Sequence, residues 1–233
     1  MKTNFKNILI VLGSLILGSL TYSCDDYSDD YLKYVEGGER IYVGKMDSLF
    51  VFGGHNRVQL GGNLPSDPKA TEVRISWNNS NNSITVPLTG GSVGERFSTI
   101  IDNLPENIYS FQVRSYDSDG NSSILSTVTG RVYGEGYVAT LFNRPITLAR
   151  LYSGNRYRIT FDNMDRSTGV IGSEIVYTSR DDGMEKTIFV DISESAILFT
   201  DWDGTSTIKY RTSFIPEKTA IDTFYTPFEI IEE

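Results

Sequence analysis

The sequence predicts an all-β protein built from two tandem immunoglobulin-like β-sandwiches. Aromatic residues make up 12% of the chain, with 14 tyrosines and 12 phenylalanines. After the N-terminal segment, short runs rich in Val, Ile, Thr, Tyr and Phe alternate with glycines and turn dipeptides. This composition is typical of strands that bury one face, and no long amphipathic helical pattern interrupts it.

Residues 1–23 have the layout of a secretory signal peptide. Lys2 and Lys6 precede an apolar run of 13 residues, Ile8 to Leu20, and small and polar residues follow it. A membrane-spanning helix needs about 20 apolar residues to cross roughly 30 Å of hydrocarbon. The run is therefore too short for a permanent span.

Cys24 is the single cysteine of the chain and stands directly after this segment. The sequence Leu20-Thr21-Tyr22-Ser23-Cys24 resembles a bacterial lipobox, in which the cysteine thiol receives a diacylglycerol. An ordinary signal followed by a free cysteine is the alternative. Lipidation explains why a secreted chain, which cannot form an internal disulfide with one cysteine, would keep an exposed thiol.

Residues 24–40 form a predicted acidic tether, with Asp25, Asp26, Asp29 and Asp30 next to the anchor. A segment with this much like charge and little to bury should stay extended and solvated. In lipoproteins that this chain resembles, acids at this position direct the protein to the outer face of the outer membrane. We therefore expect a lipid-anchored protein that faces the cell exterior.

The charge balance argues against nucleic acid as a partner. The formal net charge is −9, and removal of residues 1–23 takes away two lysines and no acid, which gives −11. A basic patch of the kind that binds nucleic acid is not expected on such a chain.

Residues 41–134 predict the first sandwich, because seven strand-like runs follow one another at short spacing. The predicted strands are Ser48–Phe52, Arg57–Leu60, Glu72–Trp77, Ser83–Leu88, Phe97–Asp102, Tyr109–Tyr116 and Leu125–Tyr133.

The most informative run lies between Leu104 and Ser123. Tyr109, Phe111 and Val113 alternate with polar residues, so they should face the core. The stretch resembles the fibronectin type III signature, in which a leucine and a proline precede a corner tyrosine. The spacing from Leu104 to Tyr109 is one residue shorter than usual, which leaves the corner hydrogen bond open.

Residues 137–233 predict a second sandwich, joined to the first near residues 134–136. Its predicted strands are Ile146–Leu151, Tyr157–Phe161, Glu174–Thr178, Lys186–Asp191, Ala196–Phe199, Ile208–Phe214 and Thr223–Ile231.

Four stretches resemble a domain-of-unknown-function family of Bacteroidetes surface lipoproteins: Ile41–Leu60, Leu104–Ser123, Gly172–Thr178 and Tyr210–Tyr225. The resemblance implies tandem fibronectin-like sandwiches near a lipid anchor and an association with glycan-import systems. It supplies no catalytic or binding residues, because none is established for that family.

The sequence offers little for catalysis, and we expect a protein that is not an enzyme. The single histidine, His55, lies in a Gly-Gly-His-Asn turn, which favours a surface residue over a catalytic base. The carboxylate pairs Asp181 with Asp182 and Asp201 with Asp203 lie in glycine-containing turns, where aspartate is common for backbone reasons. The Asp117–Asn121 stretch predicts a hairpin turn rather than a calcium loop, because its glycine comes too early. No cofactor or metal is expected.

One cluster is a candidate for glycan binding. Asp201, Trp202 and Asp203 combine an aromatic ring with carboxylates in a predicted turn, and sugars stack on rings and bond to carboxylates. The alternative is a tryptophan folded back over the end of the sandwich. Trp77 is predicted to be a core residue, since it ends an apolar alternation with Val73 and Ile75.

Two functions remain open at this level. The first is a non-catalytic binding or accessory module in glycan capture or import, with a glycan or a glycan-import complex as its partner. The second is a structural spacer or adhesin that engages a protein partner. An immunoglobulin-like fold alone does not decide between them.

Overall fold

The computed structural model describes residues 41–88, 94–154 and 156–232. By its contacts the chain divides into Met1–Tyr42 and Val43–Glu233, and all the strands lie in the second unit. The predicted signal peptide, the predicted lipidation site Cys24 and the predicted acidic tether lie outside the described residues. In the described part of the chain, no helix is long and apolar enough to cross a membrane.

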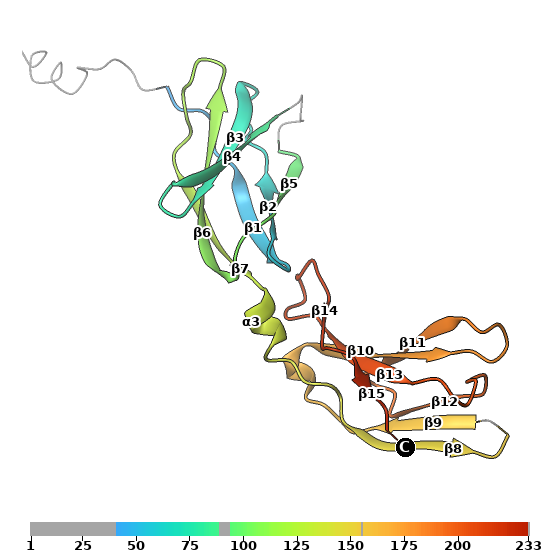
Figure 1. Cartoon of the computed structure of the whole chain (residues 1–233). Coiled ribbons are helices and arrows are strands. Elements are labelled where there is room, and N and C mark those ends of the chain that lie inside the picture. The colour runs from blue at the N-terminus through green and yellow to red at the C-terminus, as the bar shows by residue number, and fades with distance from the viewer. Residues whose placement is uncertain (1–40, 89–93, 155, 233) are drawn as a thin grey trace, which may run out of the picture. The chain divides into compact units, whose positions relative to one another are not determined.

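The first seven strands form two antiparallel sheets (Figure 1). The three-stranded sheet has the order β1-β2-β5, and the four-stranded sheet has the order β4-β3-β6-β7. Their bounds are β1 Asp47–Gly53, β2 Val58–Asn63, β3 Ala70–Trp77, β4 Asn82–Pro87, β5 Arg96–Ile101, β6 Asn107–Asp117 and β7 Ser126–Val132.

The second set of strands repeats this topology with β8, β9 and β12 in the place of β1, β2 and β5. One sheet has the order β12-β9-β8, and the other has the order β11-β10-β13-β14, with β15 also paired to β13. The bounds are β8 Ile146–Tyr152, β9 Arg156–Phe161, β10 Val170–Thr178, β11 Glu185–Asp191, β12 Ala196–Phe199, β13 Lys209–Phe214, β14 Phe224–Tyr225 and β15 Glu229–Ile230. The all-β fold class with two sandwiches is thereby confirmed.

Each sandwich has its own core, built by the alternation that the sequence shows. In β6, Tyr109, Phe111 and Val113 are buried, as predicted, and in β9 the buried set is Tyr157, Ile159 and Phe161. Period-two alternation places the residues between them on the outer face of each sheet. On β9, the outer face of the β12-β9-β8 sheet therefore carries Arg156, Arg158 and Thr160, which alternate with these core residues.

The predicted strand that runs from Thr223 to Ile231 is wrong as one element, because it is split into β14 and β15. Pro227 has no backbone N–H and cannot continue the ladder with β13. At the break, the Thr226 amide still donates to the Thr212 carbonyl at 3.0 Å, and the Thr226 hydroxyl Oγ1 accepts a hydrogen bond of 2.8 Å from the Thr212 amide.

The connection between the two sets of sheets contains a short helix, α3 (Glu135–Val138), where the sequence predicted a glycine-rich joint. A third apolar cluster lies here, formed by Tyr133, Val170, Phe214 and Phe224. Polar contacts add to it: two of the three guanidinium nitrogens of Arg57, Nε and Nη2, donate to the Asp222 carboxylate, and the Ile221 amide donates to the Gly53 carbonyl at 2.9 Å. The last loops of the chain thus bond directly to the first strands.

Candidate functional site

The candidate site is the outer face of the β12-β9-β8 sheet. On the central strand β9, Tyr157 and Ile159 point into the core, so Arg156 and Arg158 are exposed on the other side. The sequence RYRITF therefore presents two guanidinium groups from one strand, in a protein whose net charge is −9.

Strand register places further residues beside these arginines. Arg158 is the direct partner of Arg150 on β8 and of Leu198 on β12, and Arg156 is the partner of Tyr152. Tyr152 keeps 39% of its surface exposed and Leu198 keeps 53%. An aromatic ring, a leucine and three arginines therefore share one open sheet face.

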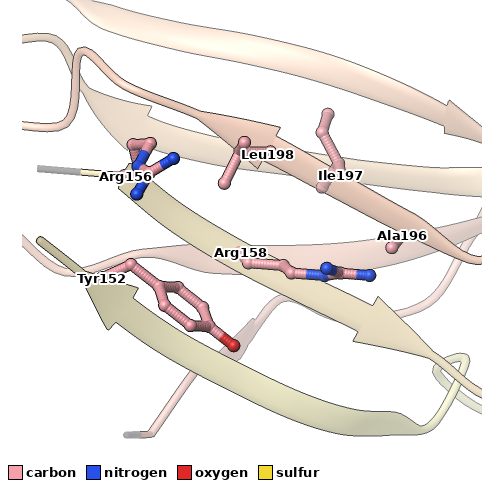
Figure 2. Close-up of a pocket in the computed structure, with 6 residues that line it drawn as sticks. All are labelled: Tyr152, Arg156, Arg158, Ala196, Ile197 and Leu198. Carbon is pink, nitrogen blue, oxygen red and sulfur yellow. The ribbon is translucent and has the colours of Figure 1, made fainter. Parts of the chain in front are cut away.

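A hollow of about 410 Å³ lies on this face. Its walls are formed by Tyr152, Arg156, Arg158, Ala196, Ile197 and Leu198. Figure 2 shows how the three strands contribute: Tyr152 comes from β8, the arginines from β9 and the apolar residues from β12. The volume falls in the range of about 300–1,000 Å³ that is usual for small-molecule sites.

The arginines of this face lack acidic partners. Within the described residues, no carboxylate forms an ion pair with Arg150, Arg156 or Arg158. The contacts that the structure gives them are weak: Arg156 Nε donates to the Ser153 carbonyl at 3.2 Å, and the Arg150 guanidinium carbon lies 5.7 Å from the centre of the Tyr152 ring. Like charges directly opposite each other, as Arg150 and Arg158 are, destabilise a sheet.

The first sandwich provides a direct comparison. Arg74 and Arg114 are also cross-strand partners, at a hollow of about 320 Å³ on the β4-β3-β6-β7 sheet. There the protein supplies partners: Arg74 Nη2 lies 3.2 Å from a Glu72 carboxylate oxygen, and Arg114 Nη1 donates to the Ser123 carbonyl at 2.8 Å. The arginine pair of the second sandwich differs in having its charges uncompensated.

Trp202, at the centre of the glycan-binding cluster predicted from sequence, is 8% exposed. Its ring packs edge-on against Tyr157 with 5.0 Å between ring centres, and its indole N–H donates to the Ser206 carbonyl at 3.0 Å. This is the folded-back arrangement that the sequence left as the alternative. A ring covered in this way presents no open face to a sugar.

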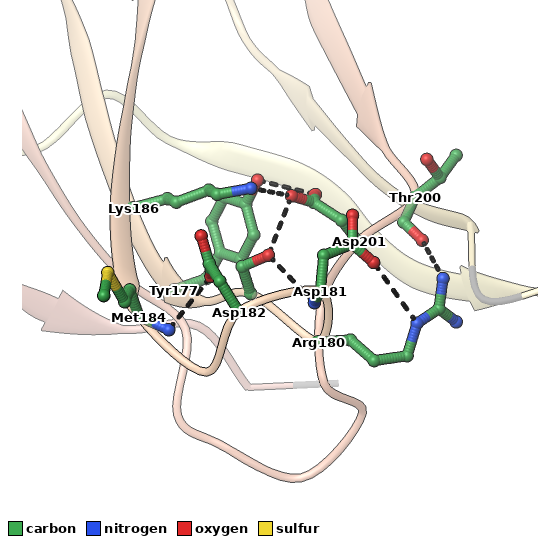
Figure 3. Close-up of polar contacts among 9 residues, drawn as sticks. Tyr177, Arg180, Asp181, Asp182, Met184, Lys186, Thr200 and Asp201 are labelled. Carbon is green, nitrogen blue, oxygen red and sulfur yellow. Dashed lines mark hydrogen bonds and ion pairs between the residues drawn. The ribbon is translucent and has the colours of Figure 1, made fainter.

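Asp201 is engaged by the protein itself (Figure 3). Lys186 Nζ and the Tyr177 hydroxyl each donate to its carboxylate at 2.7 Å, and the Ser179 hydroxyl donates at 3.2 Å. The ammonium of Lys186, followed by the Tyr177 hydroxyl, lowers the pKa of Asp201 from 3.8 to about 2. Burial, with the neighbouring Asp201 carboxylate, raises the pKa of Tyr177.

Two other aspartates of these turns, Asp182 and Asp203, bond to their own backbone, as the turn interpretation predicts, whereas the Asp181 carboxylate is exposed and lies 3.9 Å from Arg180 Nε. Asp203 accepts from the amides of Thr205 and Ser206 at 2.9 and 2.8 Å, and Asp182 accepts from the Met184 amide at 3.0 Å. These backbone bonds lower the pKa of Asp203. Carboxylates held in this way stabilise turns.

The remaining sequence candidates also have local roles. His55 is 42% exposed and its ring nitrogen Nε2 lies 3.2 Å from a Glu135 carboxylate oxygen. The Asp117 carboxylate accepts from the amides of Asp119 and Asn121 at 3.0 and 2.8 Å, which closes a hairpin turn. Trp77 is partly buried and packs against the core of the first sandwich.

Sequence reasoning did not find the arginine face. The alternation Arg156-Tyr157-Arg158-Ile159 was a signal that could have been followed, since it places two cations on the outer side of a predicted strand. The pairing of Arg150 with Arg158 depends on register between two strands, which alternation alone does not fix.

Comparisons with known proteins bear on the fold. A family model described as a domain of unknown function matches residues 24–224. No curated protein matches the chain.

Among solved structures, the crystal structure of chicken CNTN1 FN1-FN3 domains aligns with 82% of this chain at 14% identity and a TM-score of 0.41, and this chain spans 66% of its length. A segment of two fibronectin type III domains from chicken tenascin aligns with 81% of this chain and 99% of its own length, at 13% identity and a TM-score of 0.32.

Proposed function

The chain belongs to the DUF4998 family, a domain of unknown function, and from this premise we propose that it is a non-catalytic surface lipoprotein that captures a glycan for import. The proposal has three parts. A lipid on Cys24 anchors the chain in the outer membrane, residues 24–40 hold it away from the surface, and the second sandwich provides the binding face.

The observation that carries the proposal is the hollow on the β12-β9-β8 sheet. Carbohydrate sites combine an exposed ring, on which the sugar's C–H groups stack, with donors that bond its hydroxyls. Tyr152 supplies the ring, and Arg156 and Arg158 supply donors beside it. In the described residues, this face combines these features at one hollow, whereas the Asp201–Asp203 turn has its ring and carboxylates engaged internally.

A binding role also fits the remaining polar groups. Of the carboxylates considered for hydrolysis, Asp182 and Asp203 hold turns, Asp201 pairs with Lys186 and Asp181 lies beside Arg180, while the His55 ring is paired with Glu135. Two tandem sandwiches of the fibronectin type III kind are compatible with a binding or scaffold module, and the choice of function rests on the site rather than on the fold.

The test is a glycan array probed with the full chain purified in detergent, alongside its Tyr152→Ala variant. We expect retention of at least one polysaccharide by the natural chain and a clear loss of it in the variant. A Trp202→Ala variant would lose binding only together with folded structure, because that ring is in the core. Retention of no glycan by the natural chain contradicts the proposal.

The anchor is tested separately. Mass spectrometry of the protein from its native host should find diacylglycerol on the Cys24 sulfur and no residues before it, and Cys24→Ser should release the protein from the membrane fraction. An unmodified thiol would contradict the proposed location.

The second function, a spacer or adhesin, is favoured by the contacts at the connection between the sandwiches. Arg57, Asp222 and the Tyr133 cluster tie the end of the chain to its first strands. A spacer needs such a fixed joint, and proteins crosslinked at the cell surface with no dependence on sugar would support it.

A further inference from the structure

We propose that the outer face of the β12-β9-β8 sheet selects an anionic glycan, in which the carboxylate of a uronic acid lies against Arg156 and Arg158 and its ring lies against Tyr152. This inference rests on the proposed function and adds the chemical class of the ligand.

The first argument is uncompensated charge. Arg150 and Arg158 are cross-strand partners, and among the described residues none of the three arginines on this face has an acidic partner. The chain has 30 Asp and Glu against 21 Lys and Arg, so acids outnumber bases in it, and yet none of the described acids pairs with these arginines. A like-charged pair that is left open fits an external anion.

The comparison with the first sandwich strengthens this argument. Its own cross-strand pair, Arg74 with Arg114, is held by Glu72, by a Tyr116 ring 4.4 Å away and by the Ser123 carbonyl. In the first sandwich Glu72 thus offsets the charge of one arginine of such a pair. On β8 and β9, no carboxylate of the described residues pairs with the guanidinium groups, whose planar donors match a carboxylate geometrically.

The second argument is shape. The hollow of about 410 Å³ is closed on one side by the Tyr152 ring and on the other by Ala196 and Leu198, with Arg158 between them (Figure 2). A sugar with one carboxylate has both faces that this arrangement requires: an apolar ring face for tyrosine and leucine, and an anion for the arginines.

Other anions fit this face less well. Binding to an anionic bilayer takes clusters of roughly four to eight basic residues, and here three arginines act against a net charge of −9. An extended acidic peptide would pair with the edge of a sheet, whereas the hollow lies on its face.

The experiment measures binding of the full chain in detergent to oligomers of polygalacturonate, to the same oligomers as methyl esters, and to poly-glutamate of matched length. We expect the acid form to bind at least tenfold more tightly than the ester, because a charge-assisted hydrogen bond is lost with the ester. Arg158→Gln should weaken binding of the acid by about tenfold or more. The control Arg96→Gln removes the same charge on the first sandwich and should leave binding unchanged. Dextran sulfate, a glycan that carries sulfates and no carboxylate, should bind less tightly than polygalacturonate, and equal binding would overturn the assignment to a carboxylate.

Each result decides the matter. Tighter binding of the acid form, weakened about tenfold or more by Arg158→Gln at an unchanged or higher melting temperature, supports the inference. Equal binding of the ester, or an unaffected Arg158→Gln variant that still retains a glycan, overturns the inference while the proposed function stands. Poly-glutamate bound as tightly as polygalacturonate overturns the assignment to a sugar. If no glycan on the array or in this series is retained, both the inference and the proposed function fail.

Discussion

At the scale of single residues, the polar side chains of the second sandwich divide into those that the protein satisfies and those that it leaves open. Asp201 has three donors, of which Lys186 Nζ and the Tyr177 hydroxyl are the closest, at 2.7 Å. Arg158 has no partner of this kind among the described residues and faces Arg150 instead. The first arrangement stabilises the fold, and the second favours a contact with something outside it.

Asp201 makes the free energy of unfolding depend on pH in the acid range. Its pKa is about 2 in the folded chain and near 3.8 otherwise, so its contribution is fully present above about pH 4. Since the folded pKa is the lower one, the contribution is lost as the pH falls from about 4 toward 2.

We expect Asp201→Asn to lower the free energy of unfolding by on the order of 1–2 kcal/mol at neutral pH. We also expect it to flatten the fall in stability between pH 4 and 2. Urea unfolding measured over that range checks both. Asp181→Asn is the control, because that carboxylate is 65% exposed and lies 3.9 Å from Arg180. A variant as acid-sensitive as the natural chain would contradict the role given to Asp201.

Arg158→Gln should raise stability even as it weakens binding. Removing one member of a like-charged cross-strand pair relieves repulsion on the scale of a few tenths to about 1 kcal/mol. The urea midpoint checks this. The matched variant Arg74→Gln should lower the midpoint slightly, because Arg74 has Glu72 and Tyr116 as partners. A drop for Arg158→Gln would show that its guanidinium is structural.

At the scale of elements, strand alternation predicted most of the fold, because burial of one face imposes a period of two on each strand. Thirteen predicted strands correspond to single observed elements, and the strand from Thr223 to Ile231 failed because Pro227 breaks the ladder. Helix α3 was missed, since four residues are too few to show a helical period. The buried Arg144, whose guanidinium donates to the Asp162 and Glu194 carbonyls, could not be predicted because its partners are backbone atoms distant in sequence.

The corner hydrogen bond that sequence spacing left open is formed. The Tyr109 hydroxyl donates to the Pro105 carbonyl at 2.9 Å, four residues upstream. The shorter spacing therefore keeps the corner, since Pro105 rather than a residue further back supplies the acceptor.

Tyr109→Phe should destabilise the chain by about 0.5–1.5 kcal/mol, because it leaves that carbonyl without its donor while the ring stays packed. Differential scanning calorimetry of the first transition checks this. Tyr116→Phe is the control, because the contact that the structure gives this ring is with the Arg74 guanidinium rather than through its hydroxyl. An equal loss in both variants would mean that the corner bond contributes nothing specific.

At the scale of the whole chain, the connection between the sandwiches is made by side chains far apart in sequence. Asp222 accepts from Arg57 and from the His55 amide at 2.8 Å, and the Arg57 guanidinium lowers the pKa of Asp222. This contact could not be predicted from the sequence, because charged residues in two loops show no period that pairs them. It is a finding that the structure alone provides.

Asp222→Ala should open this connection locally. We expect faster hydrogen exchange at the His55 and Ile221 amides, which lose a partner or its support, with little change in β10 or β13. The control Glu174→Ala breaks the Arg211 pair within the second sandwich and should leave those two amides protected. Unchanged hydrogen exchange at the His55 amide in Asp222→Ala would show that this contact does not stabilise the connection.

The central claim is that the outer face of the β12-β9-β8 sheet is where the chain meets its ligand. The most direct measurement is hydrogen exchange with and without bound polygalacturonate oligomer, resolved to single amides. We expect the bound oligomer to slow amide exchange only in β8, β9 and β12, around Tyr152, Arg158 and Leu198. Slower exchange at the Asp201–Asp203 turn or at the Arg74 hollow of the first sandwich, with these three strands unchanged, would contradict it.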